Sequence, residues 1–321
     1  MNRATLLGYA ALAAAIAIVW AIDIYAIPWT NPYYTNIAIR VGFNLLAVMG
    51  LALVLGFTGQ FSLGHAGFMA VGAYGSASLA LYLNVPPMVA VPLGGLLAAV
   101  AGLVVGVPSL RLSGDYLAVV TLGFNQIIVV LVQNVPALGG ALGLTGVPVA
   151  TTFGITFTWV LLGAVFMRNL LRSAHGRAFA AVRDNEIATR SLGVDTTRVK
   201  VTAFVVGAFW AGIAGALLGF YNSSIFPKQF EFDRSIELLT MVVLGGTGSL
   251  SGPFLAAGLL TALPEALREF SQYRMVVYAA LLILMMGLRP QGILGRHELS
   301  DVVRGMWRRR ASASDGATNA P

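Results

Sequence analysis

The sequence is built from apolar runs of up to about 20 residues that follow one another with short connections. A transmembrane helix needs about 20 consecutive apolar residues. Ten runs can be recognised, at 4–22, 35–55, 66–82, 88–107, 116–133, 154–171, 201–221, 236–248, 253–267 and 275–288. Only 10% of the 321 residues are charged, against about 25% in an ordinary soluble domain, and this argues against a soluble enzyme. We therefore expect an all-α polytopic membrane protein with about ten transmembrane segments.

The basic residues predict the orientation of these spans. If the amino terminus is inside, the internal segments are 1–3, 56–65, 108–115, 172–200 and 289–321. Together with Arg168, which adjoins the fourth of them, they hold fifteen of the twenty Lys and Arg residues. The remaining five are Arg40, Lys228, Arg234, Arg268 and Arg274. Because positive charge is retained on the cytoplasmic side, we expect both termini to be cytoplasmic. The net charge of +7 is then a topology signal and does not indicate binding to nucleic acid.

The chain is expected to form one transmembrane domain over residues 1–300, with a cytoplasmic tail over 301–321 that is disordered at its end. A signal peptide is the alternative for the first run, because Ala15, Ile16 and Ala17 fit a cleavage pattern. The run is longer than a usual signal core, so an uncleaved anchor is favoured.

Several kinds of chemistry are missing. No glycine-rich phosphate loop ends in Gly-Lys-Ser/Thr, and neither Lys200 nor Lys228 fits one, so an ATPase would have to be another polypeptide. The three histidines, His65, His175 and His297, lack the spacing of a metal pair, and the absence of cysteine excludes disulfides and thiolate sites. We predict no catalytic residue, metal or cofactor in this chain.

Acidic residues deep in spans would favour proton-coupled transport, because a charge there is costly and is kept for function. The candidates all lie near predicted span ends: Asp23, Asp115, Glu237 and Glu265. A carboxylate relay is therefore weakened as a hypothesis.

Two glycine-rich breaks share the pattern Leu-Gly-x-Thr-Gly-x-x-Ser, at 55–62 and 244–251, and each is followed by Phe-x-Ala-x-Gly. Their glycines, with one neighbour, are Gly56, Gly59, Gly64, Gly245, Gly246 and Gly248. Paired interrupted segments point to a transport pathway, whereas small residues can also serve only close helix packing. Two matched copies favour broken-helix repeats. The expected topology puts both on one side, which implies a parallel repeat, and one miscounted half-helix would make it inverted.

Residues 172–200 form the one long, charged internal segment, and we expect a short amphipathic helix there. Asp184 can act as its N-cap and Gly193 can take a left-handed conformation after its last turn. Ile187, Ala188 and Leu192 fall on one face, and Arg183, Glu186 and Arg190 on another. Such a helix suits docking in a groove on a partner, and the alternative is a solvated loop that only enforces topology.

Six stretches together resemble the M-type permease subunit of branched-chain amino-acid ABC importers, over approximately residues 40–295. They are Gly-Gln-Phe-Ser-Leu-Gly-His-Ala at 59–66, Leu-Arg-Leu-Ser-Gly-Asp-Tyr-Leu-Ala at 110–118, Gly-Arg-Ala at 176–178, Arg-Ser-Leu-Gly at 190–193, Val-Leu-Gly-Gly at 243–246 and Arg-Pro-Gln-Gly at 289–292. Permeases for urea and short amides are similar. Residues 116–124, Tyr-Leu-Ala-Val-Val-Thr-Leu-Gly-Phe, look more like the amino-acid branch.

The resemblance implies a heterodimer with an H-type permease, two cytoplasmic ATPase subunits that carry ATP and Mg, and a periplasmic substrate-binding protein. It also implies that the internal helix is a coupling helix, made by Arg183, Asp184, Glu186, Ile187, Ala188, Arg190, Leu192 and Gly193. Residues 186–188 are similar to the Glu-Ala-Ala coupling signature, although four residues separate Ala188 from Gly193 where the family has three. Asn125 and Gln126 stand where the family often has Gly-Glu, which puts a carboxylate contact there in doubt.

We therefore predict an inner-membrane permease, in contact with lipid and partner subunits but not nucleic acid, that provides half of a pathway for small apolar amino acids. The pathway candidates are polar groups in spans or at the breaks: Asn44, Gln60, Ser62, His65, Thr121, Asn125 and Gln126. Each could instead make an internal hydrogen bond between helices. A self-sufficient carrier or channel and a membrane enzyme are the alternatives of a different class.

Overall fold

The computed structural model describes residues 3–109, 112 and 114–266, with isolated positions at 276, 279–280, 283–284, 287, 292–293 and 295. The tenth predicted span, 275–288, falls on these isolated positions, and the predicted tail, 301–321, lies outside the described residues. Within the described part the chain is helical, apart from two-residue strands that pair antiparallel, β1 (Leu144–Thr145) and β2 (Ser224–Ile225).

The α-helices follow the apolar runs of the sequence. They are α1 (Arg3–Ala21), α2 (Pro32–Leu51), α3 (His65–Tyr82), α4 (Pro87–Ser109), α5 (Asp115–Asn134), α6 (Phe153–Arg172), α7 (Ala174–Asp184), α8 (Glu186–Ser191), α9 (Thr196–Asn222), α10 (Phe232–Gly245) and α11 (Ser251–Ala266). Each of the nine predicted runs between residues 4 and 267 corresponds to one of them, with ends that differ by a few residues. The positions of the helices are therefore confirmed for this part of the chain.

Six stretches are both long and apolar enough to cross a membrane: 10–29, 32–57, 87–109, 116–134, 153–172 and 196–222. Short π-helical turns extend α1 and α2, at Ile22–Ala26 and Ala52–Phe57, and 3-10 turns lie at Ile27–Trp29, Pro136–Leu138, Gly140–Leu142 and Pro227–Phe230. With 14 and 16 residues, α10 and α11 are shorter than a full crossing of about 20 residues.

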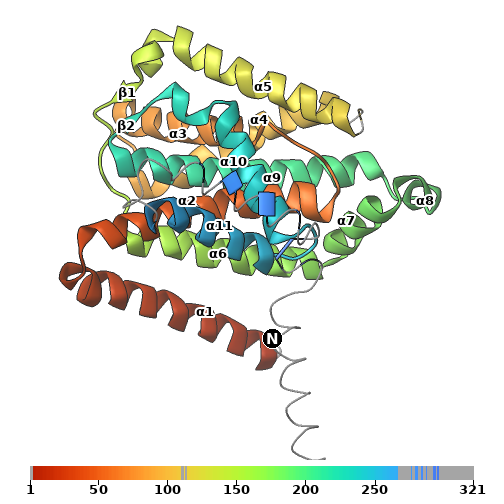
Figure 1. The fold of residues 1–321 in the computed structure, drawn as a ribbon, viewed down its shortest axis with the longest axis horizontal. Helices are drawn as coiled ribbons and strands as arrows, with labels where there is room; N and C mark the ends of the chain where they lie inside the picture. Colours follow the sequence, from red (N-terminus) through yellow and green to blue (C-terminus); the bar gives the residue numbers. More distant parts are fainter. Residues whose placement is uncertain are drawn as a thin grey trace, which may run out of the picture.

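Helix α9 is the centre of the bundle and packs against α2, α3 and α4 (Figure 1). On the other side of α2 lie α6 and α11, and α10 packs against α11. Helix α5 lies along α3, and α1 lies at the edge of the bundle, where its neighbour is α6. The α7 and α8 helices project together from one end of the bundle, and β1 and β2 lie at the other end (Figure 1).

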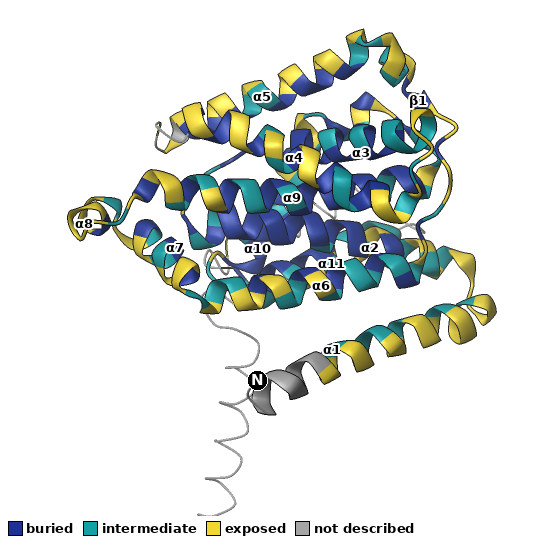
Figure 2. Cartoon of the chain, turned by 180° about the vertical axis from the view of Figure 1, so that it is seen from behind, coloured by how far each residue is buried: buried dark blue, intermediate teal, exposed yellow. Residues whose placement is uncertain are grey.

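Burial follows this order, because α1 is largely exposed and α5 mixes exposed and buried residues, while α2 and α9 are largely buried (Figure 2). Most exposed side chains on the outer helices are apolar; examples are Ile18, Ile24, Val100, Val104, Val119 and Ile127. An apolar exterior is what a helix bundle presents to lipid or to another membrane subunit.

The crossing of α3 and α9 brings backbone against backbone. A Cβ added at Gly72 would lie 2.1 Å from the carbonyl oxygen of Gly212, and one at Gly215 would lie 2.0 Å from that of Met69. Small residues are common where membrane helices approach this closely, since association in lipid relies on close packing. Glycine is therefore required at these two positions by contact rather than by backbone conformation.

Candidate functional site

The predicted internal helix is present as two helices, α7 and α8, separated by one extended residue. Asn185 has φ −160° and ψ 104°, and its Oδ1 accepts a hydrogen bond from the Ala188 N–H at 3.0 Å. Asn185 is therefore the N-cap of α8, and Asp184 is the last residue of α7, so the prediction of Asp184 as the cap was wrong by one residue. Asp and Asn are about equally favoured as caps, so residue type did not separate them.

Because the predicted helix is divided in two, Arg183 does not lie on the same helix as Glu186 and Arg190. Arg183 belongs to α7, where its Nη2 lies 3.1 Å from Asp184 Oδ1 and its Nη1 donates to the Gly56 carbonyl at 3.2 Å. The expected common face of Arg183, Glu186 and Arg190 was therefore wrong. Arg183 instead ties α7 to the first glycine-rich break.

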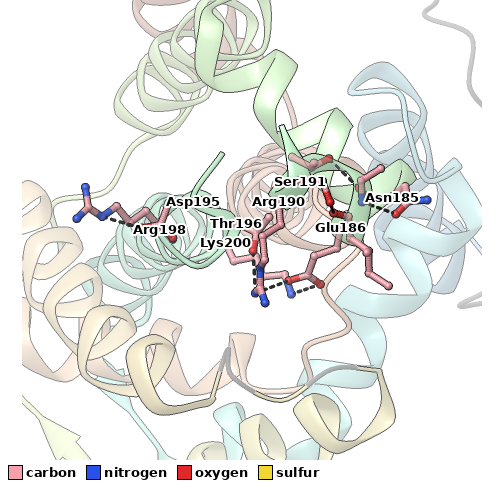
Figure 3. Close-up of polar contacts among 11 residues, drawn as sticks. Asn185, Glu186, Arg190, Ser191, Asp195, Thr196, Arg198 and Lys200 are labelled. Carbon is pink, nitrogen blue, oxygen red and sulfur yellow. Dashed lines mark hydrogen bonds and ion pairs between the residues drawn. The ribbon is translucent and has the colours of Figure 1, made fainter. Parts of the chain in front are cut away.

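Helix α8 is held by charged contacts with the start of α9 (Figure 3). Lys200 Nζ donates to Glu186 Oε2 at 2.6 Å, and the Lys200 side chain is only 10% exposed. Glu186 also lies 3.8 Å from Arg190, whose Nη2 donates to Thr196 Oγ1 at 3.2 Å. Sequence reasoning missed Lys200, because the pairing joins residues fourteen positions apart across a turn.

The opposite face of α8 is apolar and open. Ile187 is 81% exposed and Leu192 is 85% exposed, and Ala188 beside them is exposed too. Gly193 has φ +84°, and a Cβ added there would meet no atom within 4 Å, so its left-handed conformation is confirmed. Exposed apolar residues on a short, capped and anchored helix form a surface that fits a partner's groove.

The two glycine-rich breaks lie against each other at this same end of the bundle. The first follows the π-helical turn of α2 and contains Gly59 at φ +69°, and the second contains Gly246 at +111° and Gly248 at +126°. A Cβ at Gly56 would lie 3.4 Å from the backbone nitrogen of Gly248. Positive φ angles explain the glycines at three of these positions, since other residues rarely adopt them.

Five of the seven predicted pathway residues gather around the first break: Gln60, Ser62, His65, Thr121 and Asn125, all buried. Thr121 Oγ1 accepts from the Leu63 N–H at 3.0 Å, and Gln60 Nε2 donates to the Lys200 carbonyl at 3.4 Å. Three of the five buried side-chain atoms without a hydrogen-bond partner among the described residues belong to this group: Gln60 Oε1, His65 Nε2 and Asn125 Oδ1. Their role as pathway residues stays a prediction.

The other two predicted residues lie elsewhere. Gln126 is exposed on α5. Asn44 is buried in α2, where its Nδ2 donates to Thr261 Oγ1 at 2.7 Å and its Oδ1 accepts from Arg234. Asn44 therefore belongs to a second polar region.

That region is a cavity of about 450 Å³ between the first half of α2, the end of α9, the start of α10 and the end of α11. Its polar lining includes two ions of each sign, Arg40, Arg234, Glu237 and Glu265. Arg234 Nη1 donates to Glu237 Oε2 at 2.6 Å, and Glu265 Oε2 accepts from the Tyr33 hydroxyl at 3.0 Å. The sequence showed these charges only as markers of span ends, because three separate helices, α2, α10 and α11, bring them together.

No group of three His, Cys, Asp or Glu residues that could hold a metal ion is found in the described part of the chain.

Comparison with known proteins identifies the class that this arrangement represents. A model of the family described as "Branched-chain amino acid transport system / permease component" matches residues 33–286. The chain belongs to this family, and the resemblance seen in its motifs is confirmed.

Particular relatives agree with this assignment. The chain is 38% identical over 294 residues to the high-affinity branched-chain amino acid transport system permease protein LivM of Salmonella typhimurium and to that of Escherichia coli, covering 81% of this chain and 69% of each relative. It is 38% identical over 151 residues to the permease protein LivH of Escherichia coli, covering 46% of this chain and 47% of the relative. No solved structure gives a significant match.

Proposed function

We propose that this chain is the transmembrane permease subunit of an ATP-driven ABC importer for branched-chain amino acids. The observation that carries the proposal is α8, a short helix with an open apolar face that is fixed through Glu186 and Lys200 to the central helix α9. A chain without a phosphate loop needs an outside source of work, and an anchored docking helix is a means of receiving it. The relatives named for branched-chain amino acid transport supply the substrate class.

The contacts around α8 support the proposed coupling residues. A partner that moved α8 would displace Glu186, which is bound to Lys200, and the Lys200 carbonyl is bound by Gln60 of the first break. A second connection runs from α7 through Arg183 to the Gly56 carbonyl. Both connections end at the first break, which lies against the second, so force applied at α8 would reach the least regular backbone of the bundle.

The proposed complex contains this chain, a homologous H-type permease, two ATPase subunits that bind ATP and Mg, and a soluble substrate-binding protein. The match to LivH as well as LivM supports a pair of related permeases. In this assembly the chain has about ten segments with two broken-helix repeats, lies in the inner membrane, and keeps α8 and both termini on the cytoplasmic side. The distribution of basic residues supports this orientation.

The proposed pathway passes the buried polar groups at the first break. Gln60, His65 and Asn125 each have an unpartnered polar atom among the described residues, and such atoms favour water or a polar ligand as a neighbour. Ser62 and Thr121 lie beside them, and Gln126 is exposed for contact with a neighbouring subunit.

Transport of urea or short amides is the nearest alternative, and a self-sufficient carrier is the alternative of another class. The decisive test is reconstitution of the complex in liposomes with each component omitted in turn. Uptake of labelled leucine should require ATP, both permeases, the ATPases and the binding protein, and this chain alone should hydrolyse no ATP. Uptake of urea in place of leucine would assign the alternative substrate, and uptake by this chain alone would overturn the ABC assignment.

A further inference from the structure

The polar cavity lies at the end of the bundle opposite α8. Its α9 residues include Leu218 and Asn222, whereas the contact with α8 is made by Lys200 at the start of the same helix. At a rise of about 1.5 Å per residue, the distance from Lys200 to Asn222 along the helix is roughly 33 Å, which is about the thickness of the hydrocarbon core. In the proposed topology this cavity is at the periplasmic end.

The four charges of the cavity are not all paired. Arg234 is bound to Glu237 and Asn44. Arg40, which is exposed, makes no ion pair or side-chain hydrogen bond with any described residue, and the Glu265 carboxylate has the neutral Tyr33 hydroxyl as its side-chain partner there. Charged groups within membrane helices are costly, and they are retained where they pair or face a water-filled site. Among the described residues, one charge of each sign is therefore left for a ligand.

These two charges stand at the same level of the cavity. Helix α2 ends and α11 begins at the glycine-rich breaks, so the two helices run antiparallel. Asn44 and Thr261 are joined by a hydrogen bond. Arg40 is one turn before Asn44 and Glu265 is one turn after Thr261, so both lie about 6 Å beyond that bond, on the faces that carry it.

The lining also contains five uncharged polar residues, Asn44, Tyr221, Asn222, Gln229 and Thr261. Its apolar wall is formed by Ile37, Phe43, Leu218, Leu260 and Pro264. A volume of about 450 Å³ is within the range of small-molecule sites. We infer that this cavity is a holding site, within this one subunit, for a zwitterionic amino acid with an aliphatic side chain. Its carboxylate would bind Arg40, its ammonium group would bind Glu265, and its side chain would lie on the apolar wall.

The balance of charge selects this class of ligand. A simple anion would be attracted by Arg40 but repelled by Glu265, and a simple cation would be attracted by Glu265 but repelled by Arg40. A zwitterion pairs with both charges. Neutral urea would gain little from either charge. The inference rests on the proposed function for its substrate class and adds a binding site that the proposal did not contain.

The test compares ligands that differ by one charge. Binding of leucine, leucine amide and 4-methylpentanoate is measured on the membrane-embedded complex without the soluble binding protein, which would itself capture leucine. Measurements with and without a non-hydrolysable ATP analogue sample both conformations. Leucine should bind the wild-type complex about tenfold or more tightly than either analogue, since hydrogen bonds to charged groups are the strong ones.

Each substitution should then remove the interaction with one charged group of the ligand. Arg40→Gln should weaken leucine about tenfold or more and leave leucine amide within about twofold, because the amide has no carboxylate for Arg40 to bind. Glu265→Gln should weaken leucine similarly and leave 4-methylpentanoate unchanged. Arg40→Lys keeps the charge and should retain most leucine binding, and Arg168→Gln, an exposed arginine on α6, is the matched control without effect.

Equal weakening of all three ligands would show a merely structural role and overturn the inference, as would unchanged leucine binding by Arg40→Gln. Uptake of leucine by the wild-type importer is measured in parallel. Uptake without binding at this cavity would overturn the inference and leave the proposed function standing, whereas absence of uptake would sink the proposed function itself.

Discussion

The two ends of the bundle use charge in opposite ways. At the α8 end, Glu186 is bound by Lys200, and Arg183 is bound by Asp184 and by the Gly56 carbonyl. At the cavity end, Arg40 and the Glu265 carboxylate are left without a charged partner among the described residues. Paired charges fix the position of a helix, whereas unpaired charges facing a cavity are available to a ligand. Under the proposed function, the first arrangement suits mechanical connection and the second suits recognition of a ligand.

The same contrast holds for apolar groups. Ile187 of α8 and Leu192 just after it are exposed on the surface, whereas the apolar residues of the cavity line a concave wall. A projecting apolar face fits a groove in a large partner, and a concave one fits a small molecule.

The largest expected effect is all-or-none and concerns the side of the membrane that each end faces. The chain has no cysteine, so Ala188→Cys on α8 and Val149→Cys beside β1 introduce single thiols at exposed positions. A membrane-impermeant maleimide should label position 188 from the cytoplasmic side alone and position 149 from the periplasmic side alone. Labelling of both from one side would break the comparison, because the two sites would not then lie at opposite ends of a spanning bundle.

The next effect concerns the connection between α8 and α9. Glu186→Lys places a second positive charge beside Lys200, whose side chain is 10% exposed. Removing one partner of a half-buried pair leaves the other charge uncompensated. The variant should therefore lower both leucine uptake and stimulated ATP hydrolysis by about tenfold or more. Both rates are measured on the reconstituted complex.

Adding Lys200→Glu to Glu186→Lys should restore part of both rates, since the pair is then re-formed with its charges exchanged. Arg198→Glu is the control, because its pair with Asp195 has side chains 88% and 52% exposed and exposed pairs contribute little. If Glu186→Lys left both rates unchanged, α8 would be only a topological connector.

The smallest effect concerns the end of α8. Gly193→Val places a branched residue at φ +84°, where its Cβ would meet no atom within 4 Å. The backbone conformation costs such a residue on the order of 1 kcal/mol, which corresponds to roughly a fivefold change in the population of the docked helix. Uptake and ATP hydrolysis should fall together by about that factor. Gly146, at φ +80° and equally open, lies at the far end, so Gly146→Val should strain the backbone similarly and leave coupling intact. An equal loss in both variants would mean that the effect is general destabilisation.

The helices could be predicted closely from the sequence because lipid demands long apolar runs, and the run at 201–221 became α9 with only a short polar extension. Gly193 could also be predicted, since a glycine after a helical run has few other uses. These are local properties, and the sequence displays them directly.

The remaining features depend on contacts between distant residues. The N-cap at Asn185 depends on which of two neighbouring side chains accepts a hydrogen bond from the backbone of the helix that follows. The Glu186 to Lys200 pair depends on the angle between two helices. The cavity needs Arg40 and Glu265 from helices more than 200 positions apart, so no local pattern marks it. Asn44 was selected as a polar residue in a span, but its place in the cavity could not be predicted.

The backbone contact between α3 and α9 limits how this subunit can change shape. Packed helices can slide past each other when the side chains between them change their neighbours. At Gly72 and Gly215 there are no side chains between α3 and α9, because the two backbones are in direct contact. Helices α3 and α9 must therefore travel as one rigid block. Helices α10 and α11 lie outside this block, because they meet it chiefly through α2 and are joined to each other by the second glycine-rich break. Displacement of α10 and α11 relative to the block therefore does not require α3 and α9 to slide past each other.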